Sequence, residues 1–209
     1  MIVLIPMMGS GIRFRNDGYQ DHKPFIKING KPMIEYVVKP LLDKYGKVYI
    51  ACNDTTAVIV NNTFDSELVI PIVLERTDGA GTTMYEAIKL LSNNYKADWN
   101  EGLLCCDCDT ILTKDVLDKI QEGNNYILSF KDTAKTGWYS YLELDGDTIQ
   151  QLHEKVAVSE TANAGVYVFS KMSVAHDSSK STELHSPSEK YLSYCVNQSI
   201  EDGNAWKLS

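Results

Sequence analysis

Residues 2–14 read Ile-Val-Leu-Ile-Pro-Met-Met-Gly-Ser-Gly-Ile-Arg-Phe, a short apolar run that breaks into a glycine-rich turn. The apolar residues 2–6 predict a strand. Two cations, Arg13 and Lys23, follow the turn. Such an arrangement suits a polyphosphate, because backbone N–H groups and basic side chains both direct positive charge at phosphate oxygens. The stretch therefore indicates a substrate class before any fold is assumed.

Outward from this stretch, apolar periodicity predicts alternating strands and helices. Helices are expected at 32–44, 55–62, 82–92, 113–122 and 188–201, and strands at 2–6, 47–52, 69–74, 102–106, 126–130, 138–144, 148–152 and 165–169. The last helix is expected to begin with Pro187 and Ser188. The segment 171–188, rich in Ser, His, Asp and Lys, is predicted to be a mobile surface loop.

This pattern indicates an α/β fold. We expect a Rossmann-like mixed, mostly parallel sheet flanked by helices, with a small β-rich insert at about 126–169. The 209 residues are enough for one domain with a sizeable core, so a single domain over 1–209 is expected.

Composition excludes several function classes. A net charge of −8 and a pI near 5.0 argue against a general nucleic-acid or membrane-surface binder, since both need a basic face. Five cysteines, an odd number, favour neither a disulfide framework nor a zinc site and suit a reduced, cytoplasmic setting. No stretch approaches the roughly 20 apolar residues that a membrane-spanning helix needs.

The glycine turn can bind phosphate through several groups. Gly9 and Gly11 allow positive φ and close approach of a phosphate to the backbone. Arg13 can donate two hydrogen bonds to phosphate oxygens, and Lys23 can act as a point charge on a transferring phosphoryl group. An ordinary strand-to-helix turn is the alternative for Gly-x-Gly alone. The two cations and the sequence Asn-Gly-Lys-Pro-Met-Ile-Glu at 29–35 favour the phosphate site.

A second motif, Leu-Leu-Cys-Cys-Asp-Cys-Asp-Thr, occupies residues 103–110. A strand that ends in Asp-x-Asp places Asp107 and Asp109 at the carboxyl edge of a parallel sheet. Ligands of open α/β sheets bind at this edge, and carboxylate oxygens suit Mg²⁺. A turn or helix-capping pair is the alternative. The position downstream of a phosphate loop favours a metal site.

These motifs resemble the sugar-phosphate nucleotidyltransferases, the nucleoside-diphosphate-sugar pyrophosphorylases. That family's pattern runs Gly-x-Gly-(Ser/Thr)-Arg-(Phe/Leu), then Pro-Lys-Pro-Leu and Gly-Lys-Pro. The resemblance implies that Arg13, Lys23 and Asp109 are catalytic and that Asp109 binds Mg²⁺. It also implies nucleotide binding by Met8, Gly9, Ser10, Gly11, Gly81, Thr82 and Asp107.

The sequence departs from the family pattern at two positions near the turn. Ile12 stands where Ser or Thr is usual, which removes one hydroxyl contact to the triphosphate. His22 stands where Pro usually precedes the lysine, which changes only the local turn.

Two later segments extend the resemblance. Residues 78–83, Asp-Gly-Ala-Gly-Thr-Thr, are similar to the family segment that reads the nucleobase, although Thr82 could equally be a helix N-cap. Glu154, Lys155 and Asn163 match family motifs that contact the acceptor sugar phosphate. In isolation, the Glu-Lys pair would be a solvated surface pair.

The resemblance implies an Mg²⁺-dependent nucleotidyltransferase. Its partners would be a nucleoside triphosphate and a phosphorylated acceptor, either a sugar 1-phosphate or a small phosphorylated alcohol or amino acid. The products would be pyrophosphate and a nucleoside-diphosphate-linked precursor for surface polysaccharide or glycoconjugate synthesis. No nucleic-acid or membrane partner is expected, and a homodimer is left open.

Two other functions stay open. One is a glycosyltransferase of the same broad fold, which would use the Asp-x-Asp motif and consume a nucleotide sugar. The other is an inactive nucleotide-binding regulatory protein. Its supporting features are Ile12, Ser170 at the position of a second family aspartate, and a final helix followed only by residues 204–209. A naturally compact chain and a lost C-terminal piece both fit that ending.

Overall fold

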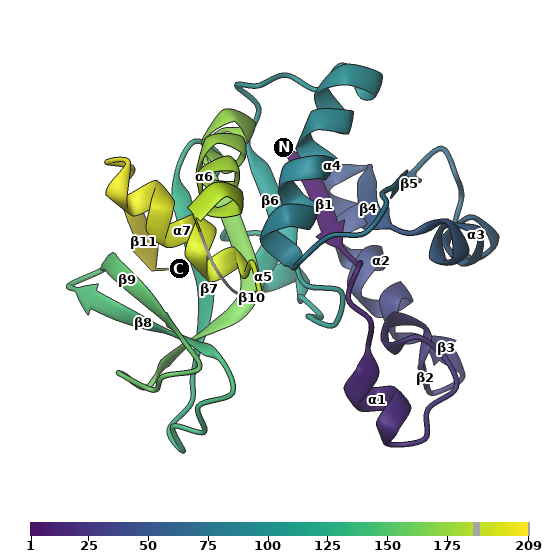
Figure 1. The fold of residues 1–209 in the computed structure, drawn as a ribbon, viewed down its shortest axis with the longest axis horizontal. Helices are drawn as coiled ribbons and strands as arrows, with labels where there is room; N and C mark the ends of the chain where they lie inside the picture. The colour runs from purple at the N-terminus through teal and green to yellow at the C-terminus, as the bar shows by residue number, and fades with distance from the viewer. Residues whose placement is uncertain (186–188, 209) are drawn as a thin grey trace.

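The computed structural model describes residues 1–185 and 189–208, and its centre is a mixed nine-stranded sheet with the order β5-β4-β1-β6-β10-β7-β11-β9-β8 (Figure 1). These strands are β1 Ile2–Pro6, β4 Val48–Cys52, β5 Val69–Val73, β6 Leu103–Cys106, β7 Asn125–Lys131, β8 Ser140–Asp145, β9 Thr148–Glu154, β10 Thr161–Phe169 and β11 Trp206–Leu208. The expected α/β class is confirmed.

The sheet has two parts that differ in strand direction. Strands β5, β4, β1 and β6 are parallel, whereas β10 runs antiparallel to both β6 and β7. The β8–β9 hairpin is the tip of the β-rich insert and turns at Gly146, which has φ +58°. A separate two-stranded ribbon pairs β2 Lys27–Ile28 with β3 Lys31–Pro32.

Helices cover both faces of the sheet (Figure 1). They are α1 Ile12–Asn16, α2 Met33–Tyr45, α3 Asp54–Thr63, α4 Ala80–Tyr95, α5 Lys114–Leu117, α6 Met172–His185 and α7 Leu192–Glu201, with a 3₁₀ turn η1 at Lys23–Phe25. Within the described ranges, none of the helices has both the length and the apolar character needed to cross a membrane.

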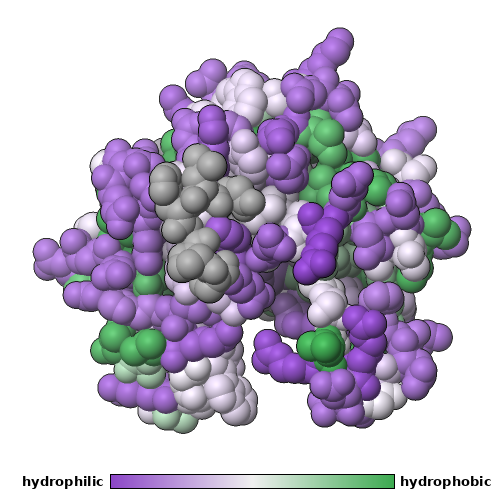
Figure 2. Space-filling view, viewed as in Figure 1, coloured by the Kyte–Doolittle hydropathy of each residue, from purple (hydrophilic) through white to green (hydrophobic). Residues whose placement is uncertain are grey.

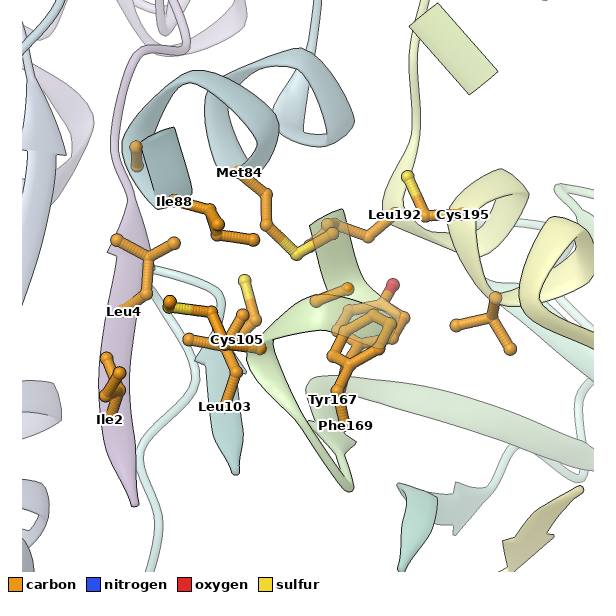
Figure 3. Packing of buried hydrophobic residues seen from close by; sticks show 14 of the residues in the cluster. Ile2, Leu4, Met84, Ile88, Leu103, Cys105, Tyr167, Phe169, Leu192 and Cys195 are labelled. Carbon is orange, nitrogen blue, oxygen red and sulfur yellow. The ribbon is translucent and has the colours of Figure 1, made fainter. Parts of the chain in front are cut away.

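Alternation along β1 divides the core into two clusters. Val3 and Ile5 face the cluster that includes α2 and α3, while Ile2 and Leu4 face the cluster formed with α4, α6 and α7. Figure 3 shows side chains of this second cluster meeting between α4 and the sheet. Because successive strand residues point to opposite faces, β1 is buried on both sides and its position in the sheet is fixed.

The prediction of a mobile loop at 171–188 was wrong over Met172–His185, which forms helix α6, and residues 186–188 of that prediction lie outside the described residues. The hydroxyls of Ser178 and Ser179 donate to the carbonyls of Val174 and Ala175, at 2.8 and 2.7 Å. These bonds satisfy polar side chains within the helix, so the serines can be buried against neighbouring helices.

Other element boundaries also differ from the expectations. Helix α5 has a single turn, because beyond Leu117 the backbone closes i−3 hydrogen bonds, such as that from Ile120 N–H to the Leu117 carbonyl. Helix α7 is described from Leu192, and the predicted start at Pro187 and Ser188 lies outside the described residues.

Strand β11 was not predicted from the sequence, and Trp206 anchors it. The strand pairs in parallel with β7. The Trp206 ring is fully buried, stands edge-on to Phe169 with centroids 4.9 Å apart, and donates from Nε1 to Ser199 Oγ at 3.1 Å. A three-residue strand shows too little alternation to be recognised from the sequence, and in the structure the buried Trp206 side chain and the pairing with β7 hold it in place.

We predict that Trp206→Ala lowers the free energy of unfolding by about 3–5 kcal/mol, because it removes the largest buried side chain and one hydrogen bond. Urea denaturation followed by circular dichroism measures the change. Trp138→Ala is the matched control: this side chain is 76% exposed, and we expect a change within about 0.5 kcal/mol. Equal effects of the two substitutions would contradict the anchoring role.

Candidate active site

The site lies at the carboxyl ends of β1 and β6. These two strands pair in parallel with Leu4 opposite Cys105, so the segments that follow them, 7–11 and 107–109, emerge at the same edge of the sheet. Ligands of open α/β sheets bind at this edge. A cavity of about 950 Å³ is found there, and Figure 2 shows the molecule hollowed between the lobe that carries α1 and the lobe that carries the β8–β9 hairpin.

Most residues predicted for the site line this cavity. They are Met8, Gly9, Ser10, Gly11, Arg13, Lys23, Asp107, Asp109, Glu154, Lys155 and Asn163. Gly81 and Thr82 are not among the lining residues, although their neighbours Gly79, Ala80 and Thr83 are.

In the glycine turn, Gly11 has φ +60°, a backbone conformation that favours glycine, directly before α1. Gly9 does not have the positive φ that its sequence position allowed. The space beside it is open, because no atom lies within 4 Å of where its Cβ would be. The Arg15 guanidinium donates to the Ser10 carbonyl and holds the turn, whereas the exposed Arg13 lines the cavity. Arg15 was missed because its partner is a backbone atom, which leaves no sequence motif.

The two loops are joined by an ion pair between Lys23 and Asp109. Both side chains are about one-third exposed, and Lys23 Nζ lies 5.5 Å from the centroid of the Phe14 ring. The proposed phosphate-binding cation and the proposed metal-binding carboxylate are therefore direct partners of opposite charge.

Asp107 is held in a pocket that only glycine at position 165 allows. Gly165 has φ +78°, and a Cβ there would lie 2.4 Å from Asp107 Oδ2. Asp107 N–H also donates to the Gly165 carbonyl at 2.8 Å. Burial raises the pKa of the Asp107 carboxyl to about 7, and the negative charge of Asp109 contributes to this increase.

Asp107 and Asp109 fit the donor set for Mg²⁺. The described residues contain no group of three or more His, Cys, Asp or Glu side chains placed to bind a metal ion. Mg²⁺ is usually held by one or two carboxylates together with substrate phosphates and water, so two aspartates beside a phosphate loop are sufficient. The arrangement fits a metal that binds together with a polyphosphate.

The opposite wall carries Glu154 and Lys155. Glu154 Oε2 accepts hydrogen bonds from Ser140 Oγ and from Ser193 Oγ, the second at 2.8 Å, so β8 and α7 both hold it. Lys155 has φ +56°, unusual for a residue with a side chain, and its Nζ donates to Tyr191 Oη at 2.8 Å.

Asn163 has a role that the sequence did not predict. Its Oδ1 accepts from Gly165 N–H at 2.8 Å, and its Nδ2 donates to Tyr167 Oη at 2.6 Å. These bonds span the irregular register between Asn163 and Val166, where β10 pairs with β7. Asn163 therefore fixes the shape of β10 where Asp107 packs against Gly165. Its contact with an acceptor stays a prediction.

Aromatic rings complete the wall beside Lys155. Phe130, Trp138 and Tyr139 all line the cavity, and Phe130 and Tyr139 meet edge-on with centroids 4.9 Å apart. Sequence reasoning assigned these rings only to strands, because a strand pattern does not show which side chains face a cavity.

Gly81 is required for packing against the chain near residue 190. Its N–H donates to the Lys190 carbonyl at 2.7 Å, and a Cβ on Gly81 would lie 2.9 Å from Cys195 Sγ. Thr82 is buried within α4, and the helix begins at Ala80, so Thr82 is not its N-cap. Nucleobase contact by Gly81 and Thr82 stays a prediction, and Gly79, Ala80 and Thr83 are the residues of this segment that reach the cavity.

Known proteins are similar to this chain in sequence and in fold. A family model described as nucleotidyl transferase matches residues 3–207. A protein named bifunctional protein GlmU from Methanococcus vannielii is 26% identical over 174 residues, which cover 80% of this chain and 40% of that protein. The chain thus spans less than half the length of this relative.

Solved structures show the same fold. The nucleoside-diphosphate-sugar pyrophosphorylase from Vibrio cholerae RC9 has a TM-score of 0.80 at 18% identity, covering 99% of this chain and 91% of that one. The inositol-1-phosphate CTP transferase from T. maritima has a TM-score of 0.76 at 16% identity, covering 99% and 83%.

We predict that Gly165→Ala destabilises the protein more than Gly146→Ala does. Both positions have positive φ, which costs a side chain about 1–2 kcal/mol, but only the residue 165 methyl would meet Asp107, since the space around residue 146 is open. Urea denaturation of both variants measures the difference. Equal free energies of unfolding would show that Asp107 does not depend on this glycine.

Proposed function

Because the chain belongs to the nucleotidyl transferase family, we propose that it joins a nucleoside triphosphate to a phosphorylated acceptor and releases pyrophosphate. The observation that carries the proposal is the composition of the cavity. One wall holds the glycine turn with Arg13 and Lys23, and the other holds Glu154 with Lys155. A triphosphate and an acceptor phosphate each need cationic partners, and the two walls supply them.

In the proposed reaction, an oxygen of the acceptor phosphate forms a bond to the α-phosphorus of the triphosphate. The bond from the α-phosphorus to the oxygen that bridges to the β-phosphorus breaks, and pyrophosphate leaves with that electron pair. The attacking oxygen is already ionised at neutral pH, so no general base is required. Catalysis then consists of positioning the reactants and compensating charge.

The residues divide this work according to their place in the cavity. The backbone amides of residues 9–11 line the triphosphate, and Arg13 binds its β and γ phosphates. Lys23 leaves its ion pair with Asp109 and binds the α-phosphoryl oxygens instead. Lys155 binds the acceptor phosphate, while Glu154, held by its two serines, accepts hydrogen bonds from acceptor hydroxyls.

Mg²⁺ is the cofactor we propose, held by Asp109 with Asp107 beside it. When bound, it would supply positive charge to the phosphate oxygens. The fit of two carboxylates at the phosphate loop supports this assignment.

For the acceptor we propose a sugar 1-phosphate or a small phosphorylated alcohol or amino acid, leading to a precursor of surface polysaccharide or glycoconjugate. The support comes from the similarity to a protein named as a nucleoside-diphosphate-sugar pyrophosphorylase and to one named as an inositol-1-phosphate CTP transferase.

A substrate screen tests this function. The four common triphosphates, each with a panel of phosphorylated acceptors, are assayed for pyrophosphate release. A glycosyltransferase would instead consume a nucleotide sugar, and a regulatory protein would bind nucleotide without turnover. Pyrophosphate release with at least one pair is the expected result, and either of the other two behaviours would refute the proposal.

We predict that Lys23→Ala lowers kcat by about 100-fold or more, because it removes the charge that faces the developing negative charge at the α-phosphoryl group. Pyrophosphate release measures kcat, and circular dichroism checks that the fold is intact. Lys27→Ala is the control, because Lys27 is an exposed lysine of β2 that does not line the cavity. Near wild-type turnover by Lys23→Ala would exclude the role.

We predict that Asp109→Asn raises the Mg²⁺ concentration needed for half-maximal activity by at least about tenfold, since groups supporting a bound metal contribute on this scale. Titration of Mg²⁺ into chelator-treated enzyme measures the change. Asp115→Asn in α5, outside the cavity lining, should leave the titration unchanged. The metal assignment fails if Asp109→Asn titrates as wild type does.

A further inference from the structure

Lys155 is held in one place from both its backbone and its side chain. It follows β9 with φ +56°, and its N–H donates to the Tyr139 carbonyl at 2.9 Å. Its Nζ donates to Tyr191 Oη at 2.8 Å and lies 4.6 Å from the centroid of the Tyr191 ring. A lysine side chain normally samples many rotamers, so these contacts restrict where its ammonium group can be.

Glu189 strengthens the contact between Tyr191 and Lys155. Tyr191 Oη donates to a Glu189 carboxylate oxygen while it accepts from Lys155. A hydroxyl that donates to a carboxylate becomes a better acceptor, because hydrogen bonds in a chain polarise one another. The hydrogen bond to Tyr191 is the main cause of a raised pKa at the Lys155 ammonium.

Tyr191 is itself fixed by the start of α4. Lys190 N–H donates to the Asp78 carbonyl at 3.0 Å, and Gly81 N–H donates to the Lys190 carbonyl at 2.7 Å. A Cβ on Gly79 would lie 2.6 Å from that carbonyl oxygen, so only glycine permits this approach. Tyr191 then serves as the N-cap residue of α7. The backbone at Tyr191 is thus held by the hydrogen bonds of Lys190 on one side and by helix α7 on the other.

We propose that Tyr191 is a positioning residue that holds the Lys155 ammonium in the cavity for the phosphate of the acceptor. An ammonium has three donors, so the bond to Tyr191 leaves two for phosphate oxygens. Tyr191 and Glu189 also line the cavity, beside Lys155. This inference rests on the proposed function, and it adds a residue that acts through Lys155.

Kinetics with Tyr191→Phe test the inference, because this variant keeps the ring and removes only the hydroxyl. We expect the KM for the phosphorylated acceptor to rise roughly tenfold, the size expected for losing a hydrogen bond to a charged group. The KM for the triphosphate should be unchanged, and kcat should stay within about twofold, because only acceptor binding is affected. An unchanged acceptor KM, or an equal rise for both substrates, would overturn the proposal.

Two further variants separate positioning from a general structural effect. Tyr194→Phe removes the same atom from a neighbouring ring that packs edge-on against Tyr191 outside the cavity lining, and it should leave all kinetic constants unchanged. In a Lys155→Met background, adding Tyr191→Phe should change the acceptor KM no further, because Tyr191 would act only through Lys155. An equal additional loss in that background would show that Tyr191 acts by another route.

A measurement without turnover separates this inference from the proposed function. Inorganic phosphate is titrated into protein with ¹³Cε-labelled lysine, and the Lys155 signal, assigned with Lys155→Arg, reports binding. We expect Tyr191→Phe to lower the pKa of Lys155 and to weaken phosphate binding roughly tenfold. Unchanged values in Tyr191→Phe would overturn the positioning role, whereas absence of pyrophosphate release by the wild-type chain would overturn the proposed function alone.

Discussion

The parallel pairing of β1 with β6 is the interaction on which the site depends. It brings the glycine turn after β1 and the aspartates after β6 to one sheet edge, where Lys23 reaches Asp109. Burial fixes the register, because alternate residues of β1 belong to the two core clusters. A slip by one residue would exchange the faces, so the hydrophobic core and the phosphate site share one constraint.

The antiparallel strand β10 adds the second half of the site. Its irregularity at Gly165 makes room for the Asp107 carboxylate, and Asn163 bonds within the same strand to hold that shape. Irregular strand pairing near a functional site re-aims side chains without disturbing the rest of the sheet. The same strand connects the parallel part of the sheet to the insert that carries Glu154 and Lys155.

Two lysines that line the cavity are held by oxygen atoms of distant segments. Lys23 pairs with Asp109, and Lys155 bonds to Tyr191. A chain with a net charge of −8 can therefore still place individual cations in the cavity, because neighbouring oxygens keep each of these two ammonium groups in place. Preorganisation of this kind lowers the cost of orienting charged groups when a phosphate arrives. Both pairs connect residues far apart in the sequence.

By itself, the sequence determined the parts that depend on local pattern: the strand at 2–6, the turn at Gly11, the strand ending in Asp-x-Asp and the α/β class. Periodicity and turn residues act over a few positions, so they can be read directly. The tertiary structure decided the rest. Residues 172–185 form helix α6, which packs against α4 and α7 with its serines buried. Gly81 is needed for the close approach to the Lys190 carbonyl, and Tyr191 holds the Lys155 side chain. Their causes are contacts between distant segments, which leave no periodic trace in the sequence.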